Sequence, residues 1–292
     1  MDPAAFNTLL EKAPLITDGG WGTELQQRGL GSGIAPEAWN RDARDNVRAV
    51  AEAYVKAGSQ IILSNTFGGS SIKLAGYGLA DQARELNRLG AQISKEAAGD
   101  KALVFASIGP CGKMVMMGDI DEDEVEASFA EQAEALAEGG ADAIVIETMT
   151  DLEEASLALK AARRTGLPVV VTLAYDSGPE LDRTMMGVSP AQAAERLGGE
   201  GAMALGANCG QGVEAFIALV EKLRAASTLP VWAKANAGMP QLVDGKMTYA
   251  QPPEAFAAEA RKLVEKGASF VGGCCGTNPA FIAALRRELN QS

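Results

Sequence analysis

Two adjacent cysteines near the C-terminus are the residues of this sequence with the clearest capacity for chemistry. Cys274 and Cys275 lie in segment 271–279 (VGGCCGTNP), directly after a short apolar run that predicts a buried strand. Successive side chains on a strand point to opposite faces, so two thiols there cannot both face a core. The flanking glycines allow the backbone to turn both sulfurs toward one point. Two thiolates brought together in this way suit a soft metal such as zinc.

A third cysteine favours the metal over the alternatives. The pair alone fits equally well a strained vicinal disulfide, or one packed thiol beside an idle one. Cys209, in segment 204–210 (ALGANCG), also follows a short apolar run and precedes a glycine. Three thiols from two strand ends match a catalytic zinc, which takes three protein ligands and keeps a fourth position open. Cys111, in segment 109–112 (GPCG), lacks this spacing, and we predict a free thiol near the rim rather than a fourth ligand.

The composition limits both the chemistry and the class of protein. The chain has 292 residues, 47% of them hydrophobic, and α/β barrels commonly reach this length as one domain. We therefore expect a single domain over residues 1–292. The sequence contains no histidine, which excludes serine–histidine and cysteine–histidine nucleophiles, histidine-ligated zinc and an imidazole base. The net charge of −12 argues against a basic face that binds nucleic acid or anionic lipid.

The cysteine usage and the N-terminal segment predict a cytoplasmic setting. Four cysteines in a chain of this length do not make a disulfide framework. Residues 1–14 lack the basic and apolar regions of a signal peptide. We also find no apolar stretch that approaches the roughly 20 residues of a membrane helix.

The elements that must position these residues alternate along the chain. Short apolar runs predict strands, and the segments between them have helical periodicity, as at Val47, Val50, Ala51, Tyr54 and Val55. The predicted strands are Leu15–Thr17, Ile61–Ser64, Leu103–Ser107, Ala143–Ile146, Val169–Leu173, Ala204–Ala207, Val231–Ala235 and Ser269–Gly272. Regular alternation of strand and helix predicts a parallel sheet, and eight repeats predict an α/β fold of the single (β/α)8 TIM barrel type. A doubly wound fold is less favoured, because its Gly-x-Gly-x-x-Gly turn after the first strand is missing.

Polar residues gather where the predicted strands end, which is where barrel enzymes place their chemistry. Asp18 and Glu147 are the carboxylates of this ring. An aspartate before two glycines is often a turn residue, and a glutamate at the start of a loop often caps a helix. Because both residues lie at the same rim, we favour a binding role for each. Lys234, also near a strand end, permits a lysine-based aldolase, but a strand lysine more often forms a salt bridge at the rim.

Taken together, these strand-end motifs resemble the homocysteine S-methyltransferase family. The family includes betaine–homocysteine methyltransferase, S-methylmethionine-dependent enzymes and the homocysteine module of cobalamin-dependent methionine synthase. The motifs are 18–23 (DGGWGT), 64–67 (SNTF), 109–110 (GP), 147–148 (ET), 206–210 (GANCG) and 272–277 (GGCCGT). The resemblance covers nearly the whole chain from about Leu15, and the Asn-Cys-Gly plus Gly-Gly-Cys-Cys combination is its specific part.

The resemblance implies a zinc-dependent enzyme that converts homocysteine to methionine. Cys209, Cys274 and Cys275 match the cysteines that bind zinc in the family. The homocysteine thiol would fill the open position and lose its proton, because a coordinating thiol is deprotonated by the metal. It would then attack a methyl carbon, with no need for a histidine or another general base.

The resemblance also implies how the substrate is held. Asp18 and Glu147 would bind the substrate ammonium, and backbone N–H groups after the first strand would meet its carboxylate. The substrate-binding candidates are Asp18, Gly19, Gly20, Thr66, Glu147 and Asn208.

The methyl donor is predicted less directly. Betaine enzymes need a cage for a quaternary ammonium, typically aromatic, and Trp21, Trp39 and Phe67 are candidates for it, although tryptophans more often pack in the core or at the rim. Thr148 follows the family's glutamate, where the animal betaine enzymes have a tyrosine, and segment 147–151 is closer to methionine synthase modules. The chain has no room for folate or cobalamin domains. We favour betaine or a similar small onium donor.

Two alternatives remain. The methyl group could come from a methylcorrinoid or methyltetrahydrofolate system on a separate partner protein, such as a corrinoid protein. The chain could also be a non-catalytic or redox protein in which Cys274 and Cys275 form a reversible disulfide and no metal binds.

Overall fold

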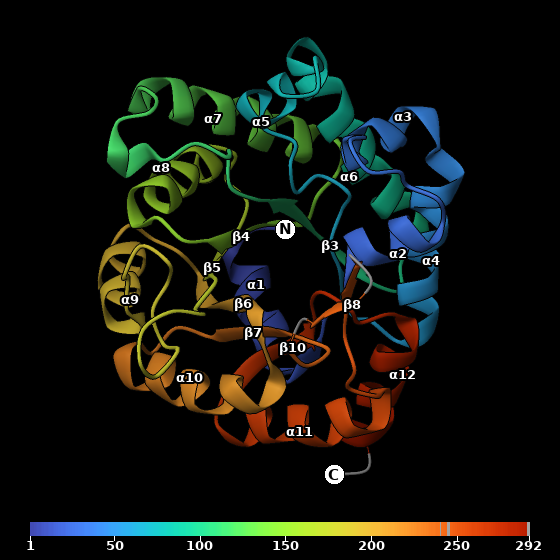
Figure 1. Ribbon diagram of the computed structural model, residues 1–292, viewed down its shortest axis with the longest axis vertical. Helices are drawn as coiled ribbons and strands as arrows, with labels where there is room; N and C mark the ends of the chain where they lie inside the picture. Colours follow the sequence, from blue (N-terminus) through green and yellow to red (C-terminus); the bar gives the residue numbers. More distant parts are fainter. Residues whose placement is uncertain (240, 244–245, 291–292) are drawn as a thin grey trace.

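The core of the molecule is one sheet of parallel strands that curls into a barrel, ringed by helices (Figure 1). The computed structural model describes residues 1–239, 241–243 and 246–290. The sheet has eight strands in the order β1-β10-β7-β6-β5-β4-β3-β2. Between its first and last members, the Gln60 N–H donates to the Ile16 carbonyl at 2.8 Å, so the barrel is nearly closed. The predicted (β/α)8 barrel is confirmed.

The eight barrel strands lie where the apolar runs predict them. They are β1 Leu15–Ile16, β2 Ile61–Ile62, β3 Leu103–Ile108, β4 Ala143–Met149, β5 Val169–Leu173, β6 Ala204–Gly212, β7 Val231–Asn236 and β10 Ala268–Gly273. The main difference is β6, which continues past the predicted end at Ala207 to Gly212. Its register with β7 shifts between Asn208 and Gly212, and this irregular stretch carries Cys209.

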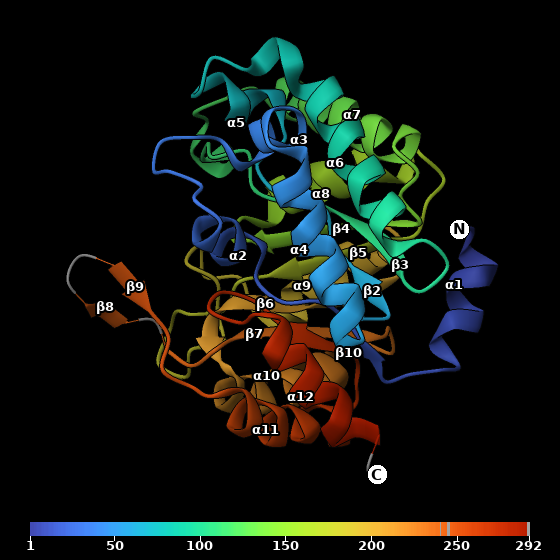
Figure 2. The same ribbon diagram turned by 90° about the vertical axis from the view of Figure 1, so that its right-hand side faces the viewer.

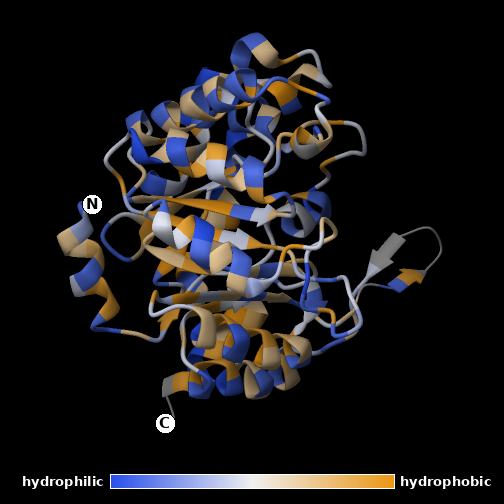
Figure 3. Ribbon diagram, turned by 90° about the vertical axis from the view of Figure 1, so that its left-hand side faces the viewer, coloured by the Kyte–Doolittle hydropathy of each residue, from blue (hydrophilic) through white to orange (hydrophobic). Residues whose placement is uncertain are grey.

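The helices cover the outside of the barrel with one apolar face each. The α-helices are α1 Pro3–Leu10, α2 Trp21–Gln27, α3 Trp39–Asp42, α4 Arg44–Ala57, α5 Ser71–Ala75, α6 Ala83–Ala98, α7 Glu122–Glu138, α8 Leu152–Arg163, α9 Pro190–Gly199, α10 Val213–Ala226, α11 Pro253–Glu265 and α12 Pro279–Asn290. Short 3-10 helices are η1 Pro36–Ala38, η2 Ala80–Gln82 and η3 Val115–Met117. In Figure 3 the central strands are largely hydrophobic, whereas the helices alternate between hydrophilic and hydrophobic residues, as expected for a surface layer.

Helix α1 closes the amino-terminal end of the barrel and was not predicted. Asp2 caps it by accepting a hydrogen bond from the Ala5 N–H at 2.8 Å. Its buried residue Phe6 packs on Phe105 and Phe270, with ring centroids 6.2 and 6.0 Å apart. Only one end of the barrel therefore remains available for a site.

A short hairpin projects from the opposite, carboxyl-terminal end. Strands β8 Gln241–Val243 and β9 Lys246–Thr248 pair antiparallel between β7 and α11. Figure 2 shows the hairpin and α1 on opposite sides of the barrel. Among the described residues, no helix combines the length and apolarity needed to cross a bilayer.

Candidate active site

Three cysteine sulfurs converge at the carboxyl-terminal end of the barrel. Cys209 Sγ lies 3.7 Å from Cys275 Sγ, and the sulfurs of Cys209, Cys274 and Cys275 all lie within 4.8 Å of one another. Strand order explains the meeting, because β7 separates β6 from β10 and the irregular end of β6 bends toward the β10 end. The predicted convergence of these three thiols is confirmed.

The backbone at Cys209 is held in a conformation that few side chains adopt. Its φ is +62°, and that of the following Gly210 is +74°, both in the left-handed region. A residue other than glycine there is strained by about 1–3 kcal/mol, and such strain persists only where the surroundings enforce it. The turn reverses the usual direction of the side chain and accounts for how a thiol at a strand end reaches the β10 cysteines.

The three sulfurs fit zinc in chemistry and in spacing. Zinc–thiolate bonds of about 2.3 Å in a tetrahedral site place sulfurs about 3.8 Å apart, close to the observed separation of Cys209 and Cys275. Hydrogen bonds from Cys274 and Cys275 lower the pKa of Cys209. Hydrogen bonding to Cys209 in turn raises the pKa of Cys274 and of Cys275. One thiol of the cluster therefore loses its proton readily, whereas deprotonation of the other two requires a compensating cation.

Cys111 lies outside this cluster. In the described part of the chain, the cysteines, aspartates and glutamates that could hold a metal together are Cys209, Cys274 and Cys275. Cys111 is a free thiol, as predicted, and it is 1% exposed. Burial and the neighbouring Glu154 raise its pKa to about 12, so it remains a protonated, unreactive thiol.

A cavity of about 390 Å³ opens beside the sulfurs. Its buried wall includes Ser107, Glu147 and Lys234 beside the three half-buried cysteines. Its exposed wall is formed by Phe67, Lys73 and Tyr77, together with the half-buried Trp21 and the buried Glu37. The cavity is large enough for two small reactants side by side.

Glu147, the last carboxylate before the β4 turn, faces this cavity from a buried position. Ser107 Oγ donates to its Oε1, and Asn208 Nδ2 donates to its Oε2 at 3.3 Å. Burial raises the pKa of Glu147, and the nearby Lys234 ammonium and the Ser107 hydrogen bond oppose that shift. The side chain is 8% exposed and available to a cation in the cavity.

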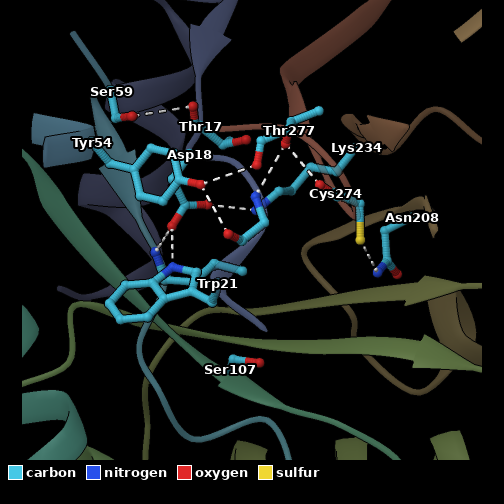
Figure 4. A network of polar contacts seen from close by, with 12 residues as sticks. Thr17, Asp18, Trp21, Tyr54, Ser59, Ser107, Asn208, Lys234, Cys274 and Thr277 are labelled. Carbon is cyan, nitrogen blue, oxygen red and sulfur yellow. Dashed lines mark hydrogen bonds and ion pairs between the residues drawn. The ribbon is translucent and has the colours of Figure 1, made fainter. Parts of the chain in front are cut away.

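Asp18 is placed differently. Its carboxylate is fully buried, with Lys234 Nζ 2.5 Å from Oδ1 and with Trp21 Nε1 and the Leu63 N–H each 2.7 Å from Oδ2 (Figure 4). These three donors occupy the carboxylate from within the protein. Among the described residues of the cavity wall, Lys234 is present and Asp18 is not. The salt bridge that strand lysines often form is therefore present here, but inside the barrel.

Burial lowers the pKa of Lys234, and the Asp18 and Glu147 carboxylates outweigh that effect, so the net shift is upward. A lysine with a raised pKa is protonated and is not a nucleophile. This environment is the opposite of the one that activates an aldolase lysine.

Of the other predicted substrate-binding residues, some line the cavity and the others lie behind its wall and hold it in place. Gly19 and Gly20 line the cavity, but the Gly20 N–H already donates to Thr277 Oγ1 at 3.1 Å. A Cβ at Gly20 would lie 2.7 Å from the Cys274 carbonyl oxygen, so only glycine allows this close approach. Thr66 is buried and donates to the Ser107 carbonyl at 2.7 Å.

Asn208 is a support for the site rather than part of the described cavity wall. It is fully buried, and its Oδ1 accepts from the Thr148 N–H at 2.7 Å and from Thr172 Oγ1 at 2.6 Å. Its Nδ2 donates to Thr148 Oγ1 at 2.6 Å. Thr148 has a left-handed φ of +63°, which these bonds hold in place next to Glu147. Figure 4 shows Asn208 beside Cys274, with its Nδ2 3.9 Å from the sulfur.

The structure separates the three aromatic candidates for the donor site. Trp21 and Phe67 line the cavity, and Phe67 is 42% exposed. Trp39 packs against the hydrophobic core between barrel and helices and is not among the described residues that line the cavity. It is the first residue of α3.

The wall residues missed from the sequence include Ser107, Lys73, Tyr77 and Glu37. Tyr77 is an exposed aromatic at the mouth, in the loop after α5. Glu37 is 2% exposed, and its Oε1 accepts from the Gly68 N–H at 2.6 Å. Burial raises the pKa of Glu37, with the hydrogen bonds to backbone N–H groups opposing that shift. The proline before Glu37 is a helix-start signal, but no spacing in the sequence points to the cavity.

Comparison with known proteins gives one consistent result. The family model described as homocysteine S-methyltransferase matches residues 15–289. The methionine synthase of Mycobacterium leprae is 31% identical over 96% of this chain, and that of Mycobacterium tuberculosis is 29% identical over 94%. The chain spans about a quarter of the length of these relatives, 24% of each. The homocysteine methyltransferase MmuM of Escherichia coli, in a structure described as its metallated form, shares the fold with a TM-score of 0.80 and 23% identity, over 96% of this chain and 98% of that one.

Proposed function

We propose that this chain, which belongs to the homocysteine S-methyltransferase family, is a zinc-dependent enzyme that methylates homocysteine to methionine, with a small onium compound as the methyl donor. The observation that carries the proposal is the convergence of three cysteine sulfurs on one wall of a cavity that also contains a buried glutamate and exposed aromatic rings.

The residues suited to hold zinc are Cys209, Cys274 and Cys275. Zinc bound there would lower the pKa of a substrate thiol that occupies its open position, which supplies a thiolate at neutral pH without a general base. The substrate thiolate then forms a bond to the methyl carbon as the bond from that carbon to the donor nitrogen or sulfur breaks. The electron pair of the broken bond stays on the donor, and the product is a neutral thioether.

Glu147 is suited to the α-ammonium of homocysteine. It faces the cavity, and Ser107 and Asn208 fix its orientation from the two neighbouring sides. A charge-assisted hydrogen bond from an ammonium to such a carboxylate contributes about 1.5–3 kcal/mol. The carboxylate thereby selects amino-acid thiols over simple thiols.

The exposed wall of the cavity supports an onium donor. Trp21, Phe67 and Tyr77 present aromatic rings there, and Glu37 adds a buried carboxylate. Aromatic faces attract quaternary ammonium and sulfonium groups, and a carboxylate adds charge attraction. Trp39, predicted for this role, is left out because it is not among the described residues that line the cavity.

A second candidate for the donor is a methylcorrinoid on a partner protein. Among the described residues, the exposed large hydrophobic side chains all lie in the segments that connect a barrel strand to the next long helix, on the face with the cavity. They are Ile34, Phe67, Tyr77, Met114, Met117 of η3, Leu181, Met185, Met239 and Leu242 of β8. Apolar side chains gathered on one face favour contact with another macromolecule. The methionine synthases to which the chain is similar are about four times its length, which is consistent with other domains that contact this barrel.

The proposal is tested by metal analysis and a donor screen. Protein purified under reducing conditions should contain about one zinc per chain. Incubated with homocysteine, it should form methionine from betaine or S-methylmethionine, measured by mass spectrometry. Methionine formed from methylcobalamin or methyltetrahydrofolate alone would support the second candidate. A protein without zinc that forms no methionine from any of the four donors would contradict both, and would favour the redox alternative with a Cys274–Cys275 disulfide.

A further inference from the structure

Lys234 brings a positive charge into the cavity wall between the two strands that carry the cysteines. On β7 it lies in register with Asn208 of β6 and with Gly272 of β10. Its side chain is 2% exposed and lines the cavity together with Glu147. A lysine this deeply buried in a barrel interior needs a specific reason, because desolvation of its charge is costly.

Asp18 explains only part of this arrangement. An ammonium group has three N–H donors, and among the described residues Asp18 Oδ1 is the hydrogen-bond acceptor of Lys234. Asp18 is itself engaged by three donors of the protein, from Lys234, Trp21 and Leu63. The cavity wall therefore includes the carboxylates of Glu37 and Glu147 and the ammonium groups of Lys73 and Lys234, and Asp18 is not among its described residues. Of these charges, Glu147 and Lys234 are buried close to each other, since each shifts the pKa of the other.

We infer that Lys234 binds the carboxylate of the substrate while Glu147 binds its ammonium, so that two opposite charges on the wall recognise an amino-acid zwitterion. The inference rests on the proposed function and deepens it. Opposite charges suit a zwitterion, whereas two carboxylates would attract its ammonium and repel its carboxylate. Asp18 acts behind Lys234 as a positioning residue that holds the ammonium in place, as the contacts in Figure 4 show.

The alternative is that Lys234 serves only to neutralise Asp18. Replacing such a lysine would change the affinity for every thiol equally, because it would act only by disturbing the structure around Asp18 at the end of β1. A lysine that binds the substrate carboxylate would instead discriminate among thiols by that one group. The two roles are therefore separated by substrate chemistry rather than by the size of the effect.

The test measures binding of three thiols to the zinc-loaded protein by isothermal titration calorimetry. Homocysteine has both charged groups, 4-mercaptobutyrate lacks the ammonium, and 3-mercaptopropylamine lacks the carboxylate. In Lys234→Met we expect the Kd of homocysteine and of 4-mercaptobutyrate, which both have a carboxylate, to rise about tenfold or more. The Kd of 3-mercaptopropylamine should rise less than about threefold. Glu147→Gln should show the mirror pattern, with losses for homocysteine and the amine.

Two further variants control for effects of misfolding on the measured Kd values. Asp18→Asn combined with Lys234→Met removes both buried charges and should keep the carboxylate-specific loss. Lys95→Met breaks a partly buried ion pair with Asp142 at the amino-terminal end of the barrel, and should leave the Kd of all three thiols unchanged.

Equal losses for all three thiols in the double variant would overturn the inference and leave the proposed function standing. The expected binding pattern without methionine formation from any donor would overturn the proposed function and leave the inference standing. A wild-type protein that binds none of the three thiols would overturn both.

Discussion

Cys209 and Cys275 are 66 residues apart in the chain, yet their sulfurs lie 3.7 Å apart across the carboxyl-terminal end of the barrel. One strand, β7, lies between the strands that carry them, and it contributes Lys234 to the same wall. Three neighbouring strands thus supply the thiol cluster and the positive charge beside it. Glu147 completes this wall from β4.

Loss of any thiol of the cluster should remove zinc and activity together. In Cys209→Ala, Cys274→Ala and Cys275→Ala, two remaining ligands hold zinc poorly, and turnover should fall roughly a hundredfold or more. The barrel should persist, because these residues lie at strand ends outside the hydrophobic core. Zinc content by mass spectrometry, circular dichroism and methionine formation check the three statements.

Cys111→Ala is the matched control for these variants, since this buried thiol lies outside the cluster. It should keep zinc and turnover. A cluster variant that loses zinc but keeps most of its methyl transfer would contradict the mechanism.

The Glu147 carboxylate should make homocysteine binding depend on pH. Burial raises its pKa, so it loses its charge at a higher pH than an exposed glutamate does as pH falls. Affinity for homocysteine should therefore fall faster than affinity for 4-mercaptobutyrate, which has no ammonium. The ratio of the two Kd values cancels the effect of pH on the thiol cluster. In Glu147→Gln that ratio should be flat with pH, and a wild-type ratio that is already flat would argue against the contact.

The positions of the strands and of the thiol cluster could be predicted because both depend on local signals. Apolar runs bounded by glycines mark buried strands, and the parallel barrel brings their carboxyl ends to one rim. Helix α1 was missed because Phe6 is its only buried residue, too little for a periodic pattern. The hairpin β8–β9 was missed because its strands are three residues each, too short for a visible alternation.

The pairing of Asp18 with Lys234 could not be predicted from spacing. The two residues are 216 positions apart, and their contact depends on which side chains the closed barrel turns inward. The same holds for Glu37, whose carboxylate is buried only because the loop at Gly68 folds over it. Contacts of this kind depend on the assembled barrel, whereas a motif records only neighbours in the chain.

The Asp18–Lys234 pair should contribute strongly to stability when only one partner is changed. Asp18→Asn leaves a buried ammonium without its counter-charge, which should lower the free energy of unfolding by about 3–5 kcal/mol. The double change Asp18→Asn and Lys234→Met should recover most of that loss, because it removes both buried charges. Denaturant unfolding of the three proteins measures the effect.

The same Asp18→Asn variant also tests the predicted contact of Asp18 with the substrate ammonium. A rise in KM confined to thiols with an amino group, without loss of stability, would support that contact. A stability loss that the double variant does not reverse would argue that the two charges act independently.

The last prediction separates the two methyl donors by the part of the surface that each requires. If a small onium donor binds beside Phe67 and Tyr77, then Phe67→Ala and Tyr77→Ala should each raise the KM of the donor. A cation–π contact of about 0.5–2 kcal/mol corresponds to a change of roughly 2- to 30-fold. The KM of homocysteine should change little, because these rings lie on the exposed wall of the cavity. Met185→Glu, at an exposed position in the loop after β5 and outside the described cavity wall, should leave both constants unchanged.

If a corrinoid protein delivers the methyl group, the pattern reverses: onium compounds yield no methionine, and Met185→Glu slows transfer by placing a charge on the apolar face that the partner would cover. Steady-state kinetics with betaine, S-methylmethionine and methylcobalamin distinguish these outcomes, and neither result would alter the assignment of the three cysteines.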